Sequence, residues 1–129
     1  MYEERYVEAA DGLRLYCRDY PNPSPRSAVL CLPGLTRNSG DFAPLATRIS
    51  ETRRVLCPDL RGRGKSGYDP TWRNYHPGRY AADLWQLLDT LQVEEAVVIG
   101  TSLGGWLAML LNHQRPGRIS PIARSNAAR

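Results

Sequence analysis

The sequence lacks the features that mark membrane, secreted and disulfide-rich proteins. No stretch approaches the roughly 20 apolar residues of a bilayer-spanning helix, and no apolar run follows residues 1–5. We therefore expect no signal peptide, no membrane partner and a cytoplasmic location. Cys17, Cys31 and Cys57 are widely spaced and form no C-x-x-C pair. This spacing argues against a disulfide framework and against a metal site, and it favours buried thiols.

Acidic residues are missing from the end of the chain. Residues 1–114 carry thirteen basic and thirteen acidic side chains, whereas residues 115–129 carry four arginines and no acid. The net charge of +4 therefore belongs to the tail and forms no basic stripe on the folded part. We expect no nucleic-acid partner.

Apolar runs alternate with segments of helical periodicity, which predicts an α/β fold with a mainly parallel sheet and flanking helices. Buried strands are expected at residues 28–32, 54–58 and 96–99. Helices are expected at residues 42–49, capped by Asp41, and at residues 79–92 and 103–112. Segments 6–8 and 13–20 flank Asp11-Gly12, which predicts a two-residue hairpin at an antiparallel edge. At 129 residues the chain is long enough for one domain with its own core.

The segment Gly100-Thr101-Ser102-Leu103-Gly104 joins the third of these strands to the helix that follows it. A Gly-x-Ser-x-Gly turn in this position is typical of a nucleophile elbow, which lifts one serine oxygen clear of a parallel sheet. Side chains at the two glycine positions would crowd a turn held at strained backbone angles. A glycine-rich turn without chemistry is the alternative.

A nucleophile elbow needs two backbone N–H donors for a developing oxyanion. Leu103 provides one candidate at the start of the helix, where the helix dipole also favours negative charge. The second is expected from the loop after residue 32, because the carboxyl ends of parallel strands meet at one edge. Gly34 lets the backbone approach closely there, and Leu35 is the candidate donor, with Thr36 second.

Three motifs at the ends of predicted strands together resemble the α/β-hydrolase fold family. They are Leu32-Pro33-Gly34-Leu35, Asp59-Leu60-Arg61-Gly62-Arg63-Gly64-Lys65-Ser66-Gly67 and Gly100-Thr101-Ser102-Leu103-Gly104-Gly105. They follow the family's order and spacing, and the resemblance covers about residues 3–119. It implies the amino-terminal half of that fold and a serine nucleophile at Ser102. It also implies a small-molecule substrate with an ester-like or activated C–C bond, and no cofactor. Family members often carry histidine where Pro33 stands, a change that leaves the backbone donor in place.

The loop after residue 58 also contains two rival motifs. Residues 62–67 match the dinucleotide-binding G-x-G-x-x-G, and Gly64-Lys65-Ser66 matches the end of a phosphate-binding loop. The phosphate-binding motif fails because Asp59 stands where its first glycine belongs. The dinucleotide motif fails on context, since irregular chain rather than a helix follows it. We expect Asp59 and Arg61 to be structural polar residues.

The family's catalytic acid and histidine base, which follow the serine in chain order, have no counterparts in this sequence. No Asp or Glu follows Ser102. His113 lies eleven residues along the predicted helix, roughly 16 Å from the serine and too far to share a proton. His76 is expected to line the substrate pocket, together with Gly34 and Thr36, rather than to act as the base. Asp59 and Asp83 precede the serine and are poor candidates for the acid.

The segment 120–129 contains a proline and predicts no strand. We expect a partial hydrolase domain over residues 1–119 and a disordered basic tail outside the family over residues 120–129. The hypothesis is an amino-terminal portion, ended by truncation or an altered reading frame, that lacks the acid and base. A non-catalytic binding module is the alternative, and self-association through an exposed sheet edge is a further expectation.

Overall fold

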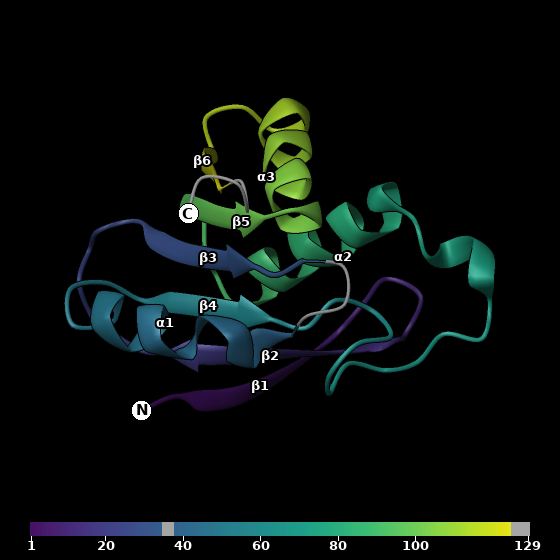
Figure 1. Cartoon of the computed structure of the whole chain (residues 1–129), viewed down its shortest axis with the longest axis horizontal. Coiled ribbons are helices and arrows are strands. Elements are labelled where there is room, and N and C mark those ends of the chain that lie inside the picture. Colours follow the sequence, from purple (N-terminus) through teal and green to yellow (C-terminus); the bar gives the residue numbers. More distant parts are fainter. Residues whose placement is uncertain (35–37, 125–129) are drawn as a thin grey trace.

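The computed structural model describes residues 1–34 and 38–124, and Figure 1 shows their arrangement. These residues form a sheet with the strand order β1-β2-β4-β3-β5-β6. The strands are β1 (Glu3–Glu8), β2 (Arg14–Tyr20), β3 (Ala28–Leu32), β4 (Val55–Pro58), β5 (Ala96–Thr101) and β6 (Ile119–Arg124). Strands β4, β3, β5 and β6 run parallel, whereas β1 and β2 are antiparallel and form one edge. The predicted α/β fold with an antiparallel edge hairpin is confirmed.

Helices cover both faces of this sheet. The short helix η1 (Ser39–Phe42) and α1 (Ala43–Ile49) lie on one face, in front in Figure 1. Helices α2 (Pro77–Thr90) and α3 (Leu103–Gln114) lie on the other, and η2 (Trp72–Asn74) precedes α2. None of the helices in the described ranges combines the length and apolarity needed to cross a membrane.

The side chains of the central strands point alternately to the two faces of the sheet, and this alternation produces two apolar cores, one on each face. Leu30, Leu56 and Val98 face α2 and α3, because successive side chains of a strand point to opposite faces. Cys31 and Cys57 face α1 on the other side. Both are buried free thiols, as is Cys17, which confirms the interpretation of the cysteines as small apolar residues. Because β3 and β4 are buried on both faces, their sequences are continuous apolar runs.

The hairpin between β1 and β2 is present, but the predicted two-residue turn is wrong. Ala9 N–H donates to the Leu13 carbonyl, and Gly12 N–H donates to the Ala9 carbonyl. The turn therefore spans three residues between this pair, with Gly12 at φ +90°. A three-residue hairpin needs a left-handed residue at its end, and Asp-Gly serves this longer turn as well as a two-residue one.

The predicted cap at Asp41 is also wrong in its detail. The side chain of Asn38 accepts from Gly40 N–H, and the carboxylate of Asp41 accepts from Asn38 N–H. This reciprocal capping box opens η1, which then continues into α1 without a side-chain cap. Asp41 thus supports the cap from inside the first turn, three residues after the residue that starts it.

The prediction of no strand beyond residue 119 is wrong for β6. Its backbone pairs in parallel with β5, from Ala96 opposite Ile119 to Thr101 opposite Arg124. A proline normally argues against a strand because it cannot donate to the ladder. Pro121 is tolerated because neighbouring residues of a strand direct their N–H groups to opposite sides, and its own position faces away from β5. The remainder of the expected disordered tail, residues 125–129, lies outside the described residues.

Candidate active site

Ser102 occupies the turn between β5 and α3 in a strained conformation. Its backbone angles are φ 55° and ψ −120°, and its side chain is exposed. Positive φ in a non-glycine residue costs about 1 to 3 kcal/mol and persists only where the surrounding structure enforces it. Gln92, which closes α2, is the other such residue in the described ranges. The structure thus presents a hydroxyl group at the amino terminus of a helix, at the carboxyl edge of parallel strands.

Two glycines enforce the sharp entry into α3. A Cβ atom on Gly100 would overlap the backbone of Gly104 and Gly105, and one on Gly104 would overlap the carbonyl of Leu32. The chain therefore reverses direction within a few residues after β5. As a result, the first turn of α3 packs against the end of β3. The steric reason inferred from the sequence for glycine at these two positions agrees with this packing.

The loop after β3 starts beside this turn. Leu32 of β3 pairs with Gly100 of β5, so Gly34 follows directly at the same edge of the sheet and is buried. The candidate donor Leu35 and its alternative Thr36 lie outside the described residues. Leu103 is the first residue of α3, and the N–H groups of a first helical turn have no partner within the helix.

Asp59 connects the loops that follow β3 and β4. Its carboxylate is buried and accepts hydrogen bonds from the backbone N–H of Ser39 at 2.6 Å and of Lys65 at 2.9 Å. Its own N–H donates to the carbonyl of Tyr16 in β2. The residue therefore fixes the end of the loop that begins at Gly34, which agrees with the structural role predicted for it.

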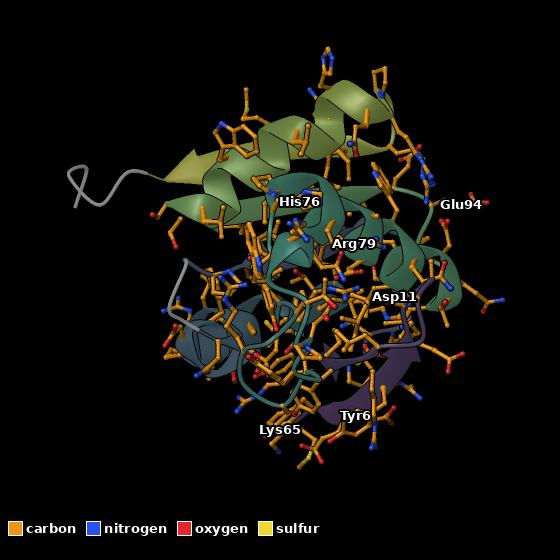
Figure 2. The ribbon with its side chains drawn as sticks, turned by 90° about the vertical axis from the view of Figure 1, so that its right-hand side faces the viewer. Tyr6, Asp11, Lys65, His76, Arg79 and Glu94 are labelled. Atoms are coloured by element: carbon orange, nitrogen blue, oxygen red, sulfur yellow. The ribbon has the colours of Figure 1, made fainter. Side chains whose placement is uncertain are left out.

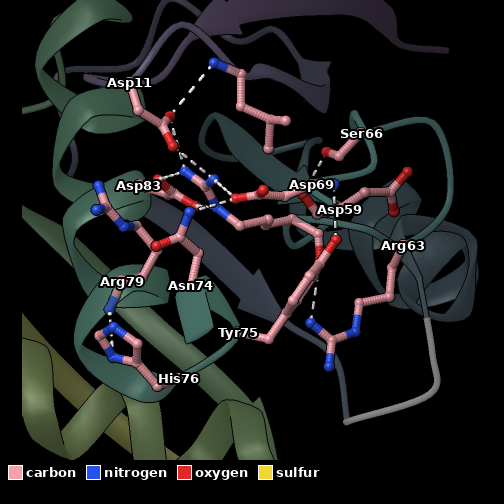
Figure 3. Close-up of polar contacts among 12 residues, drawn as sticks. Asp11, Asp59, Arg63, Ser66, Asp69, Asn74, Tyr75, His76, Arg79 and Asp83 are labelled. Atoms are coloured by element: carbon pink, nitrogen blue, oxygen red, sulfur yellow. Dashed lines mark hydrogen bonds and ion pairs between the residues drawn. The ribbon is translucent and has the colours of Figure 1, made fainter. Parts of the chain in front are cut away.

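Arg61 is buried and lies at the centre of an ionic cluster. Figure 3 labels its partners Asp11, Asp69 and Asp83. Its guanidinium forms a two-bonded pair with Asp83 of α2, both bonds 2.9 Å long. It also bonds Asp11 of the hairpin at 2.8 and 3.0 Å and Asp69 at 2.7 Å. One cation thus holds the hairpin, the loop after β4 and α2 together, which confirms Arg61 as a structural residue.

The pKa values of the three carboxylates of this cluster are shifted in different directions. Hydrogen bonding to Arg61 lowers the pKa of Asp11 to about 2. The side chain of Asn74, the N–H of Thr71 and Arg61 together lower the pKa of Asp69. Burial raises the pKa of Asp83 above its ordinary value, against the opposing effect of Arg61. Asp83 is thus held in place by a charge partner while desolvation works against its ionised form.

The sequence does not reveal the three aspartates as partners of Arg61. They lie 50, 8 and 22 residues away along the chain. No local motif encodes such pairs, because separate strands, loops and helices supply them. Asn74 and Tyr75 complete the arrangement: the Asn74 side chain donates to Asp69, and the Tyr75 hydroxyl accepts from Asp69 N–H.

The glycines of the G-x-G-x-x-G segment pack against side chains. A Cβ on Gly62 would meet the ring of Tyr75, and one on Gly64 would overlap the carboxylate of Asp59. Helix α2 begins only at Pro77, and the N–H of Lys65 is already bonded to Asp59. A dinucleotide-binding loop must open a helix and offer free N–H groups to phosphate. The geometry does not support that alternative.

Neither histidine is bonded to Ser102. His76 is the exposed N-cap of α2, and its Nδ1 accepts from Arg79 N–H at 3.2 Å. In Figure 1, β3, β4 and β5 point to the right, and Figure 2 views the molecule from that side. His76 and Arg79 are labelled there, at the end of the molecule where these strands end. His113 is exposed near the end of α3. In the tautomer that caps α2, His76 carries its proton on Nε2, so this ring has no free acceptor nitrogen.

The fold and the turn at Ser102 agree with a family match along the chain. The family model described as "alpha/beta hydrolase fold" matches residues 27–127, and the chain belongs to this family. The match extends beyond residue 119, the expected end of the resemblance.

Individual relatives support the same assignment. A 3-hydroxybutyrate-oligomer hydrolase from Cupriavidus necator is 33% identical over 96 residues, which are 74% of this chain and 33% of that protein. The crystal structure of an α/β hydrolase from Novosphingobium aromaticivorans is 51% identical with a TM-score of 0.90 and covers 96% of this chain and 43% of its own. An epoxide hydrolase from Vigna radiata, at 22% identity and a TM-score of 0.83 over 96% of this chain and 38% of its own, supports the fold alone. The chain therefore spans less than half the length of each of these proteins.

Proposed function

We propose that this chain carries the nucleophile of a serine hydrolase that acts on an ester-like bond of a small molecule. The observation that carries the proposal is the exposed Ser102 at φ 55° between β5 and α3. A serine without a chemical role gains nothing from such a conformation, which glycine adopts without strain. Hydrolases among the relatives support the same reaction class.

In the proposed reaction, Ser102 Oγ attacks the carbonyl carbon of the ester and forms a tetrahedral oxyanion. The N–H of Leu103 at the start of α3 donates to this oxygen, and the helix dipole adds to the stabilisation. Leu35 N–H is the proposed second donor. The base takes the proton of Ser102 Oγ and passes it to the leaving oxygen, so that collapse of the intermediate expels the alcohol and leaves an acyl-serine. Water then hydrolyses the acyl-serine to the carboxylic acid and the free serine.

We propose that the catalytic acid and base come from polypeptide outside these 129 residues. No Asp or Glu follows Ser102, and Asp59 and Asp83 are engaged by Ser39 and Arg61. His76 caps α2. The proteins to which the chain is similar are more than twice its length, which leaves room for both groups. Without them, the activity of this chain is expected to fall by several orders of magnitude.

A fluorophosphonate probe tests the role of Ser102. We expect slow, stoichiometric labelling at Ser102, located by peptide mass spectrometry and abolished in Ser102→Ala. Ser120→Ala serves as the matched control, because this exposed serine lies in β6 and is expected to leave labelling unchanged. Labelling that is equal in wild type and Ser102→Ala would remove the proposal.

A binding module without catalysis is the second candidate, because no base contacts Ser102 in the described part of the chain. Hydrolysis of 3-hydroxybutyrate esters, chosen from the activity of the Cupriavidus necator relative, separates the two. Turnover at ordinary enzyme rates that disappears in His76→Ala would instead make His76 the base. Binding of such an ester without turnover, unaffected by Ser102→Ala, favours the binding module.

A further inference from the structure

Asp59 uses its two carboxylate oxygens for two different loops. Its Oδ1 accepts a hydrogen bond from the backbone N–H of Ser39 at 2.6 Å, and its Oδ2 accepts one from the N–H of Lys65 at 2.9 Å. Asp59 is only 3% exposed, so water does not compete for these bonds. The carboxylate therefore bridges the loop after β4, to which it belongs, and the start of η1.

Residues 62–67, whose sequence matches a nucleotide-binding motif, hold this carboxylate in place. A Cβ atom on Gly64, which has φ +53°, would overlap the carboxylate. The Ser66 hydroxyl donates to the Asp59 carbonyl at 2.7 Å and accepts from the N–H of Tyr16 at 2.9 Å. The segment thus binds an anionic group of its own chain through a backbone N–H, which is the chemistry by which such loops bind phosphate.

The loop between β3 and η1 is fixed at both ends. At its start, Gly34 is buried where β3 packs against the first turn of α3. At its end, Ser39 is 4% exposed and bonded to Asp59. Four residues separate these two anchors, and one of them is Leu35, the proposed second oxyanion donor. A shift of either anchor therefore changes where that donor can lie.

We propose that Asp59 is a positioning residue for the oxyanion. By holding the N–H of Ser39, it places the loop that carries the Leu35 N–H relative to Ser102. Oxyanion donors act only within hydrogen-bond distance of the developing charge, and removal of one donor slows such reactions about 10²- to 10³-fold. A displaced donor loses part of that effect. This inference rests on the proposed function of Ser102.

Two substitutions break the link to Ser39 in different ways. Asp59→Asn replaces one acceptor oxygen with an NH₂ group, so either Ser39 or Lys65 loses its acceptor. Ser39→Pro removes the N–H itself and leaves the bond between Asp59 and Lys65 in place. Proline suits the first position of a helix, and Asn38 before it is already extended, at φ −144° and ψ −178°. Ser39→Pro therefore keeps the proposal testable if Asp59→Asn does not fold.

The measurement compares labelling of Ser102 by a fluorophosphonate and by the matching fluorophosphonothioate, in which sulfur replaces the phosphoryl oxygen. Sulfur is a weak hydrogen-bond acceptor, so the ratio of the two rates reports how well the oxyanion donors are placed. The fraction of folded protein cancels from this ratio. We expect Asp59→Asn and Ser39→Pro to lower the fluorophosphonate rate about tenfold and to lower the ratio as well.

Ser66→Ala is the matched control. It removes two hydrogen bonds from the same loop but leaves the carboxylate of Asp59 and its bond to Ser39 untouched. Its ratio of labelling rates should equal that of the wild type. Thermal melts establish which variants are folded before the rates are compared.

Three results would overturn the proposal and leave the role of Ser102 intact. One is an unchanged ratio in folded Ser39→Pro, and another is a fall in Ser66→Ala as large as in Asp59→Asn. The third is a Ser39→Pro variant that does not fold, which would show that the fold itself requires the link. A wild type that is not labelled at Ser102 would instead remove the proposed function, and the role of Asp59 with it.

Discussion

The carbonyl group of Leu32 packs so closely against Gly104 that a Cβ atom at position 104 would overlap it. This contact joins the end of β3 to the first turn of α3, and so joins the loop that carries Gly34 to the turn that carries Ser102. The distance between the loop after β3 and the turn that carries Ser102 therefore depends on the absence of a Cβ atom at position 104.

Gly104→Ala should consequently destabilise the protein and displace α3 from β3. Overpacking of this kind costs about 3 kcal/mol of unfolding free energy when the clash is with backbone rather than with a flexible side chain. Urea unfolding measures the loss. Trp106→Ala, on the exposed side of the same helix, is the control and should change stability far less. Equal effects of the two substitutions would contradict the packing described here.

Ser102 should be a site where stability and reactivity oppose each other. Ser102→Gly relieves the positive φ and is expected to raise the unfolding free energy by about 1 kcal/mol while abolishing fluorophosphonate labelling. Ser102→Ala removes the hydroxyl but keeps the strained backbone, so it should lose labelling without the gain in stability. Thermal melts of the two variants measured side by side separate strain from chemistry. A glycine variant no more stable than the alanine variant would rule out stored strain at this turn.

Arg61 should be among the residues most sensitive to truncation. Arg61→Ala leaves Asp83 and Asp69 buried without their cation, and breaking a buried pair in this way costs about 3 to 5 kcal/mol. Arg61→Lys keeps the charge but loses the planar two-bonded geometry, so its effect should be intermediate. Arg48→Ala, an exposed arginine of α1, is the control and should stay within about 0.5 kcal/mol. The prediction fails if Arg61→Ala unfolds at the same urea concentration as the control.

Asp11 should contribute stability that depends on pH. Its pKa is lowered from 3.8 to about 2 in the folded protein, so folding favours the ionised form. The contribution is present above about pH 4 and is lost as the pH falls toward 2. We expect Asp11→Asn to cost about 1 kcal/mol at pH 6, a value reduced for the solvent exposure of this carboxylate.

The measurement is urea unfolding of wild type and Asp11→Asn between pH 6 and pH 2.5. The gap between the two proteins should narrow as the pH falls through this range. A gap that stays constant would show that Asp11 acts through its shape rather than through its charge. Glu95→Gln, which changes an exposed carboxylate between α2 and β5, controls for the general effect of removing one negative charge.

Local pattern was sufficient for most of the fold. Continuous apolar runs located β3 and β4 because strands buried on both faces need such runs. Glycines two residues either side of Ser102 indicated the turn into α3, because only glycine tolerates that packing. The sequence was less informative for β6, where a proline suggests irregular chain unless the direction of its nitrogen is known. That direction is defined only after β6 has paired with β5.

The sequence alone determined the order of strands and helices as far as α3, the family and the position of the candidate nucleophile. The order of the elements and the position of the nucleophile follow from periodicity and sterics within a few residues, and the family follows from the resemblance of three motifs at strand ends. The tertiary structure decided which charged residues pair. Arg61 bonds to Asp11, Asp69 and Asp83 only when the hairpin, the loop after β4 and α2 come together. It also decided that the nitrogen of Pro121 faces away from β5. Both depend on contacts between segments far apart in the chain, and no local pattern records them.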